Sequence, residues 1–155
     1  MDVTIETRLT ALGVTLPDAA APAANYMPAV HHGDLLYVSG QLPMGADGIA
    51  CSGRLGDGVT LEAGRSAARL CAINVLAQAK TALNGDLERI RRVVRITGFV
   101  ASAPAFTEQH LVVNGASDLL VEALGERGRH ARASVGVASL PLNAAVEVDA
   151  IIAVD

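Results

Sequence analysis

Two charged residues near the end of the chain are the first candidates for chemistry. In one β-prone run, alternation places Arg132 on the same face as Ser134 and away from Val135. In the next run, Glu147 projects from the face opposite Val146. If the two runs pair as a hairpin, the cation and the carboxylate can face one another. Such a pair is either an ordinary cross-strand ion pair, worth about 0.2 to 1 kcal/mol, or the charged part of a functional site.

The histidines and cysteines form no recognisable metal or nucleophile motif. His31 and His32 are adjacent, so on a strand they point to opposite faces and cannot chelate one ion together. Cys51 and Cys71 lack a CxxC or zinc spacing and predict free thiols in a reducing compartment. The chain also lacks a GxSxG elbow, a Walker loop and an HExxH pair. We therefore expect no metal site.

The composition predicts a small cytoplasmic protein with one domain. A chain of 155 residues supports one core, and we take residues 1–155 as one domain with a helical extension at 1–20. The net charge of −4 does not favour nucleic acid as a partner. The N-terminus resembles neither a signal nor a transit peptide, and no apolar run approaches the roughly 20 residues that span a bilayer. No membrane association is expected.

Hydrophobic periodicity predicts three helices and five strands around one long loop. Apolar spacing indicates helices over residues 4–12, 61–83 and 106–124, the second capped by Thr60 and the third ended by Gly125. Alternation indicates strands over residues 27–30, 35–38, 93–101, 133–140 and 145–154. The glycine-rich stretch 41–59 has no apolar period and predicts a surface loop.

This order of elements predicts an α+β fold with two helices packed on one face of a mixed sheet. Residues 31–34 would form the turn of a hairpin between the first two strands. The last two strands would form a second hairpin around residues 141–143. No helix remains to cover the other face of the sheet, so self-association is the simplest way to bury it.

Three segments of the chain together resemble the Rid/YjgF family of reactive-intermediate deaminases. The first runs from Asn25-Tyr26-Met27-Pro28 to Ser39-Gly40-Gln41-Leu42-Pro43, the second is Val113-Asn114-Gly115, and the third runs from Ala131-Arg132 through Leu140-Pro141 to Val146-Glu147-Val148. The resemblance covers nearly everything after the first twenty or so residues. The GRHAR and VNGASDLL segments are similar to a longer branch of the family.

The resemblance implies a chorismate-mutase-like fold that assembles as a homotrimer around a central barrel of sheets, with clefts between subunits. It implies cofactor-free hydrolysis of enamines and imines, such as 2-aminoacrylate, to 2-keto acids and ammonia. Arg132 matches the residue that clamps the substrate carboxylate, and Glu147 the residue that orients or activates water. The positions that match the lining of the cleft are Tyr26, Ser39, Gly40, Asn114 and Ser134.

Some departures from the family pattern leave substrate identity open. Ser134 stands where well-known deaminases often carry cysteine, and Ala-Asn-Tyr26 replaces the usual Gly-Pro-Tyr. Two alternatives to the deaminase remain. One is a module of the same fold that binds a small carboxylate without turning it over. The other is an endoribonuclease, which the acidic balance and the scarcity of stacking aromatics disfavour.

Overall fold

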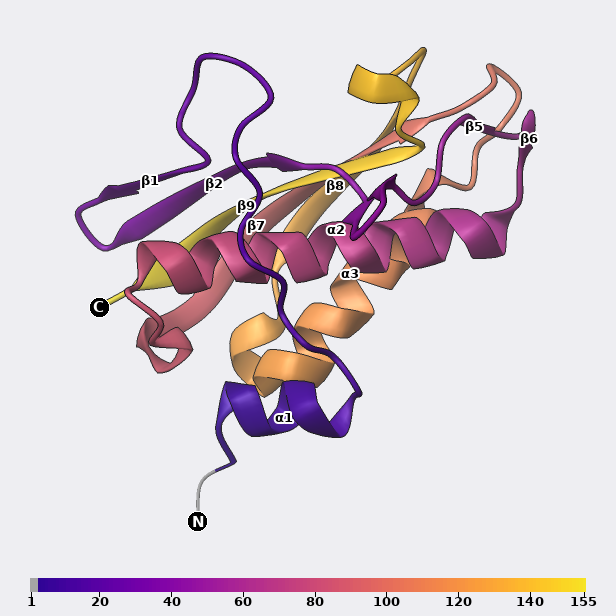
Figure 1. Cartoon of the computed structure of the whole chain (residues 1–155). Helices are drawn as coiled ribbons and strands as arrows, with labels where there is room; N and C mark the ends of the chain where they lie inside the picture. The colour runs from indigo at the N-terminus through magenta and orange to yellow at the C-terminus, as the bar shows by residue number, and fades with distance from the viewer. Residues whose placement is uncertain (1–2) are drawn as a thin grey trace.

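A five-stranded mixed sheet forms the centre of the protein, as the computed structural model of residues 3–155 shows (Figure 1). In spatial order the strands are β1 (Ala29–His32), β2 (Leu35–Gln41), β9 (Val146–Val154), β7 (Ile90–Ala101) and β8 (Ala131–Val137). β7 and β8 run parallel, and the other neighbouring pairs run antiparallel. The predicted α+β fold is confirmed. Positions 1 and 2 of the predicted N-terminal extension lie outside the described residues.

Two long helices, α2 (Leu61–Ala82) and α3 (Gln109–Leu124), cover one face of the sheet (Figure 1). Thr60 caps α2 as predicted, accepting a hydrogen bond from the Ala63 N–H at 3.1 Å. A short helix, α1 (Ile5–Ala11), lies against α3. Single 3-10 turns follow at Leu87–Arg89, Gly125–Gly128 and Pro141–Asn143. None of the helices in residues 3–155 combines the length and the hydropathy needed to cross a membrane.

Side-chain alternation on β9 separates the two faces of the sheet. Val146, Val148 and Ala150 are buried against the helices, whereas Glu147 and Asp149 point to the other face and are partly exposed. We call that second face the open face. It carries three large exposed side chains, Val30, Tyr37 and Val135. The uncovered sheet face expected from the sequence is therefore present in the folded chain.

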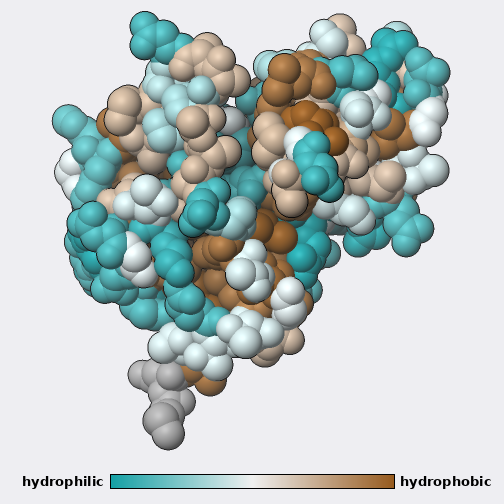
Figure 2. Space-filling model, viewed as in Figure 1, coloured by the Kyte–Doolittle hydropathy of each residue, from teal (hydrophilic) through white to brown (hydrophobic). Residues whose placement is uncertain are grey.

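On the helix side, the chain that follows α1 crosses α2 and leaves an open groove. Parts of three segments line the groove, residues 13–20, 44–46 and 69–74. Val14, Leu70 and Ile73 are among the lining residues. Figure 2 shows hydrophobic side chains gathered near the centre of this side, with hydrophilic ones around them. The N-terminal segment thus adds apolar contacts to the helix layer.

Small residues let α2 and α3 approach each other closely, and Gly115 is the sharpest case. A Cβ at Gly115 would collide with the backbone carbonyl of Arg65 on the facing helix. We expect Gly115→Ala to lower the free energy of unfolding by about 1 to 3 kcal/mol, because the helices must separate. Urea unfolding at fixed protein concentration measures this change. Gly45→Ala is the control, since the nearest atom to a Cβ there is 3.7 Å away; equal stability of the two variants would contradict the prediction.

The predicted C-terminal hairpin is wrong. β8 and β9 do not pair, because β7 lies between them in the sheet. Helix α3 returns the chain to the start of β7, so that β8 runs parallel to β7 in a β-α-β crossover. The Pro141–Asn143 turn then carries the chain past β7, and β9 inserts between β7 and β2. Alternation alone finds such strands but does not give their order.

The region predicted as one loop holds two small ribbons. β3 (Met44–Gly45) pairs antiparallel with β4 (Gly48–Ile49), and β5 (Arg54–Leu55) pairs parallel with β6 (Gly58–Val59). Strands of two residues are too short to show alternation, so their sequence reads as loop. The first hairpin is confirmed, but its turn is shorter than predicted, because His31 and His32 belong to β1.

Candidate functional site

Arg132 lies at the start of the edge strand β8 and points toward α3. Its Nη1 donates to Ser117 Oγ at 3.0 Å, and its Nη2 donates to the backbone carbonyl of His110 at 2.9 Å. The guanidinium carries five N–H donors. Within residues 3–155 it makes only these two hydrogen bonds. The side chain is therefore held by α3 and keeps donors free for an anion. A carboxylate is the group that best fits a planar guanidinium fork.

Two further predicted residues lie in the same region. Ser134 shares a face of β8 with Arg132, and its Oγ is buried without a hydrogen-bond partner in the part of the chain that the structure describes. Asn114 lies on α3 between His110 and Ser117, at helical spacing from both, and is half-buried. Arg132, Ser134 and Asn114 together form what we call the arginine half-site.

Glu147 lies on the open face of β9, with its carboxyl packed directly against Gly40 of β2. A Cβ at Gly40 would collide with that carboxyl group, so only glycine leaves room for it. The side chain is half-buried, and burial raises the pKa of Glu147. The nearby carboxylate of Asp149 raises this pKa further. A carboxyl group whose pKa is raised in this way holds a proton more readily than an ordinary glutamate and is suited to proton transfer.

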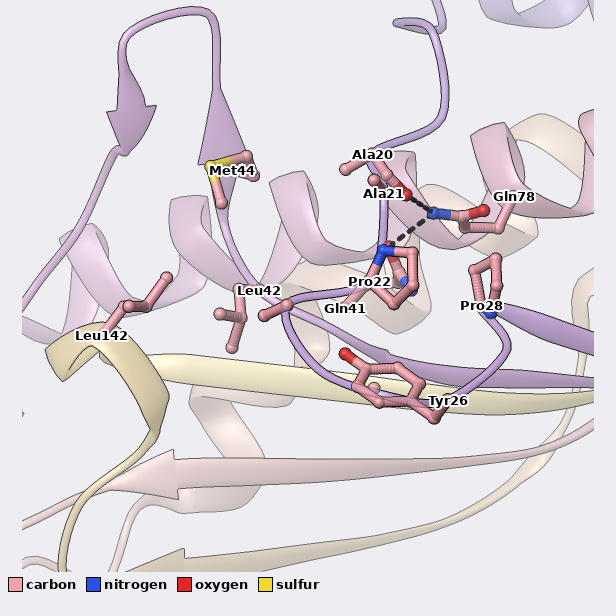
Figure 3. A pocket seen from close by; sticks show the side chains of 12 residues that line it. Ala20, Ala21, Pro22, Tyr26, Pro28, Gln41, Leu42, Met44, Gln78 and Leu142 are labelled. Atoms are coloured by element: carbon pink, nitrogen blue, oxygen red, sulfur yellow. Dashed lines mark hydrogen bonds between the residues drawn. The ribbon is translucent and has the colours of Figure 1, made fainter.

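Tyr26 and Gly40 line one small cavity, and Gly40 is also the residue that the Glu147 carboxyl contacts. The cavity has a volume of about 60 Å³ and is also lined by Pro28 and Leu142. In Figure 3 Leu142 lies on one side of the cavity and Gln78 on the other, with the Tyr26 ring between them in this view. The Gln78 amide donates to the Ala20 carbonyl at 2.8 Å and to Gln41 Oε1 at 3.4 Å, which fixes the chain around the cavity.

Ser39 completes this group on β2. Its hydroxyl donates to the Met27 carbonyl at 2.7 Å, tying β2 to the segment that carries Tyr26. It also lines a shallow pocket of the open face together with Thr97 and Asp149. The backbone N–H of Thr97 donates to the Asp149 carboxylate at 3.1 Å. We call Tyr26, Ser39, Gly40 and Glu147 the glutamate half-site.

The two half-sites lie on opposite faces of the sheet, which corrects the expectation that Arg132 and Glu147 face one another. Arg132 is level with buried Ile96 on β7, so its side chain is on the helix face. Glu147 is paired with Phe99 of β7, on the open face. No ion pair joins Arg132 to Glu147 in residues 3–155. A single chain therefore holds the two charges apart.

Sequence reasoning missed the surroundings of Arg132. The sequence pattern assigns no role to Ser117 or His130, which hydrogen-bond to each other at 2.8 Å. The signal that could have found Ser117 is its spacing, because it lies one turn after Asn114 on the same helix. His130 lies two positions before Arg132, but it precedes the first residue of β8. The alternation of side chains along a strand therefore does not predict that His130 lies on the same face as Arg132.

Comparison with known proteins gives a consistent family assignment. Residues 6–153 match the family model described as "YjgF/chorismate_mutase-like, putative endoribonuclease". Protein TCP17 of Trypanosoma cruzi is 52% identical over 149 residues, which cover 96% of this chain and 92% of that protein. The crystal structure of protein Atu1372 from Agrobacterium tumefaciens has a TM-score of 0.92 and 60% identity, covering 97% of this chain and 92% of that one.

A more distant structure shares the fold. The crystal structure of E. coli TdcF with bound serine has a TM-score of 0.63 and 20% identity. The match covers 89% of this chain and 94% of that one. The arrangement of sheet and helices is thus preserved at low sequence identity.

Proposed function

This chain belongs to the YjgF/chorismate mutase-like family, and from that premise we propose that it hydrolyses reactive enamines and imines to 2-keto acids and ammonia. Substrates such as 2-aminoacrylate carry a carboxylate beside an electrophilic carbon. Hydrolysis then requires a group that binds the carboxylate, one ordered water and one proton carrier. The described residues include candidates for the first and the third of these.

The observation that carries the proposal is the setting of Glu147. Its carboxyl is half-buried and packs against Gly40, and burial together with Asp149 raises its pKa. In this role Glu147 takes a proton from water as the water attacks the imine carbon. It delivers this proton to the imine nitrogen, which gives a carbinolamine. It then carries the hydroxyl proton of the carbinolamine to the amino group, so that the C–N bond breaks, ammonia leaves and the keto group forms.

Arg132 is the proposed carboxylate clamp. Its guanidinium is held by Ser117 and the His110 carbonyl with donors to spare, so a carboxylate can bind without first ordering a long side chain. Ser134 and Asn114 would line the same end of the ligand. The serine bound to E. coli TdcF, an amino acid with a carboxylate, is a ligand of the same chemical class.

We further propose that the complete site forms between copies of the chain in a homotrimer. The half-sites face away from each other in one chain, so the arginine half-site of one copy must meet the glutamate half-site of another. The Tyr26 cavity, at about 60 Å³, has room for only a few water molecules. A neighbouring copy packed on the open face would cover Val30, Tyr37 and Val135.

A charge on the open face tests this assembly. We expect Val135→Arg to dissociate the oligomer and to reduce deaminase activity at least about 10-fold. Val135 is exposed in the single chain, but in the proposed oligomer an arginine there would be buried at the interface without a partner for its charge. Sedimentation velocity and activity are measured on the same samples. Val3→Arg is the control, since Val3 is 54% exposed and lies before α1. Full activity in a monomeric Val135→Arg protein would show that the site does not need a second copy.

The activity itself is tested by release of ammonia and pyruvate from 2-aminoacrylate generated in situ. Addition of the protein should accelerate release well above the uncatalysed rate. If the protein does not accelerate the hydrolysis of any of several imino acids while carboxylate ligands still bind, the chain is a carboxylate-binding module and the enzymatic proposal is rejected.

A further inference from the structure

A continuous chain of hydrogen bonds runs from Arg132 through Ser117 to His130, a residue to which the proposed reaction gives no role. Arg132 Nη1 donates to Ser117 Oγ at 3.0 Å. Ser117 Oγ lies 2.8 Å from His130 Nε2, and His130 Nδ1 is hydrogen-bonded to the Gly128 carbonyl. The chain thus joins β8, α3 and the turn that connects them.

The direction of each hydrogen bond follows from the chemistry of the groups. A backbone carbonyl only accepts, so His130 Nδ1 must carry the proton that it donates to Gly128. Burial, followed by the positive charge of Arg132, lowers the pKa of His130, although the hydrogen bond to Gly128 acts against this, and the ring is neutral at pH 7. Its Nε2 therefore accepts the Ser117 O–H, and the Ser117 oxygen is free to accept from Arg132.

The neighbouring charges do not compete for this histidine. Arg129 pairs with Glu126 at 3.0 Å, and Arg127 pairs with Glu88 at 3.0 Å. On α3, Asp118 points to Arg65 of α2 at 3.9 Å. The positive charge of Arg132 acts on His130 directly, and Ser117 Oγ is hydrogen-bonded to both side chains.

We infer that Ser117 and His130 are positioning residues that aim the Arg132 guanidinium at the substrate carboxylate. This inference rests on the proposed clamp role of Arg132. With the Ser117 hydroxyl fixed as an acceptor, Nη1 is held in place, and the His110 carbonyl holds Nη2. The guanidinium plane is then set before a ligand arrives, which lowers the entropy lost on binding. Loss of the acceptor leaves the cation in place but frees its orientation.

The test compares carboxylate binding by matched serine variants of the whole protein. The probe is L-serine, with serinamide as the analogue that lacks the carboxylate, and calorimetry measures the dissociation constants. We expect Ser117→Ala to weaken L-serine binding about 10-fold, as loss of preorganisation in a charge-assisted contact would, and to leave serinamide binding unchanged. Ser117→Thr keeps the hydroxyl and should restore binding. Ser66→Ala on α2 is the control at an exposed serine.

In the kinetic assay the same change should appear mainly as a higher KM, with kcat less affected. A second measurement needs no ligand, because nitrogen NMR of the imidazole should show the Nδ1–H tautomer for His130 in the wild-type protein. The Nε2–H tautomer would overturn the inference. The inference would also be overturned if Ser117→Ala bound L-serine with wild-type affinity while Arg132→Ala had lost binding. In that case the proposed role of Arg132 as the carboxylate clamp would stand. If Arg132→Ala binds L-serine as the wild type does, the proposed function fails first.

Discussion

Arg132→Ala is expected to lower kcat/KM for a carboxylate-bearing imine by about 100- to 1000-fold. A charge-assisted bidentate contact that is lost on truncation costs roughly 3 to 4 kcal/mol, and each 1.4 kcal/mol is a factor of about ten. The structure makes the loss specific, because the guanidinium is already held by Ser117 and the His110 carbonyl. Ammonia release from 2-aminoacrylate measures the effect, with the oligomeric state checked by sedimentation.

Two variants show whether the effect comes from the guanidinium fork. Arg132→Lys keeps the positive charge but loses the two-pronged geometry, so we expect most of the loss to remain. Arg129→Ala removes an exposed arginine that pairs with Glu126, away from the proposed clamp, and should behave as the wild type. If Arg129→Ala loses as much activity as Arg132→Ala, general charge rather than a clamp is responsible.

Glu147→Gln is expected to reduce kcat by about 100- to 10,000-fold while carboxylate binding survives. The amide keeps the shape of the side chain next to Gly40 but cannot take up a proton. Turnover of 2-aminoacrylate and calorimetry with L-serine together separate chemistry from binding. Asp34→Asn is the control for loss of a carboxylate elsewhere, since Asp34 lies in the turn between β1 and β2. Parallel loss of binding and turnover in Glu147→Gln would instead assign it a structural role.

The pH dependence of the reaction follows from the same carboxyl group. Proton uptake from water needs the ionised form of Glu147, so kcat/KM should fall as pH drops through its pKa. Burial and then Asp149 raise that pKa, so the fall should occur at a higher pH than for an ordinary glutamate. Asp149→Asn removes the second cause and should move the acid limb to lower pH. A pH–rate profile of the two proteins provides the comparison.

Local features of this fold could be predicted from the sequence because they depend on neighbours along the chain. The Thr60 cap, the ending of α3 at Gly125 and the alternation of β9 each follow from residues within one turn or one strand. The order of the strands in the sheet does not follow from such local residues. A short connection after β8 looks the same whether the next strand pairs with β8 or passes beyond β7.

The residues proposed for the candidate site come from the sequence, whereas their arrangement in space comes from the structure. Arg132 and Glu147 were expected to face one another, yet β7 lies between their strands, and the register of each strand against β7 places the two side chains on opposite faces. The contact between Gly40 and Glu147 depends on the irregular register of β2 against β9, which no local pattern reveals. Ser117 and His130 meet only because α3 folds back onto the start of β8.

The placement of the two half-sites on opposite faces of the sheet also has a genetic consequence. If each complete site takes Arg132 from one copy and Glu147 from the next, an allele defective at one position still carries an intact residue at the other. Cells that express both defective alleles would assemble mixed oligomers in which some junctions join two intact half-sites. Two chains that are each inactive alone would then complement one another, whereas two alleles defective in the same half-site would not.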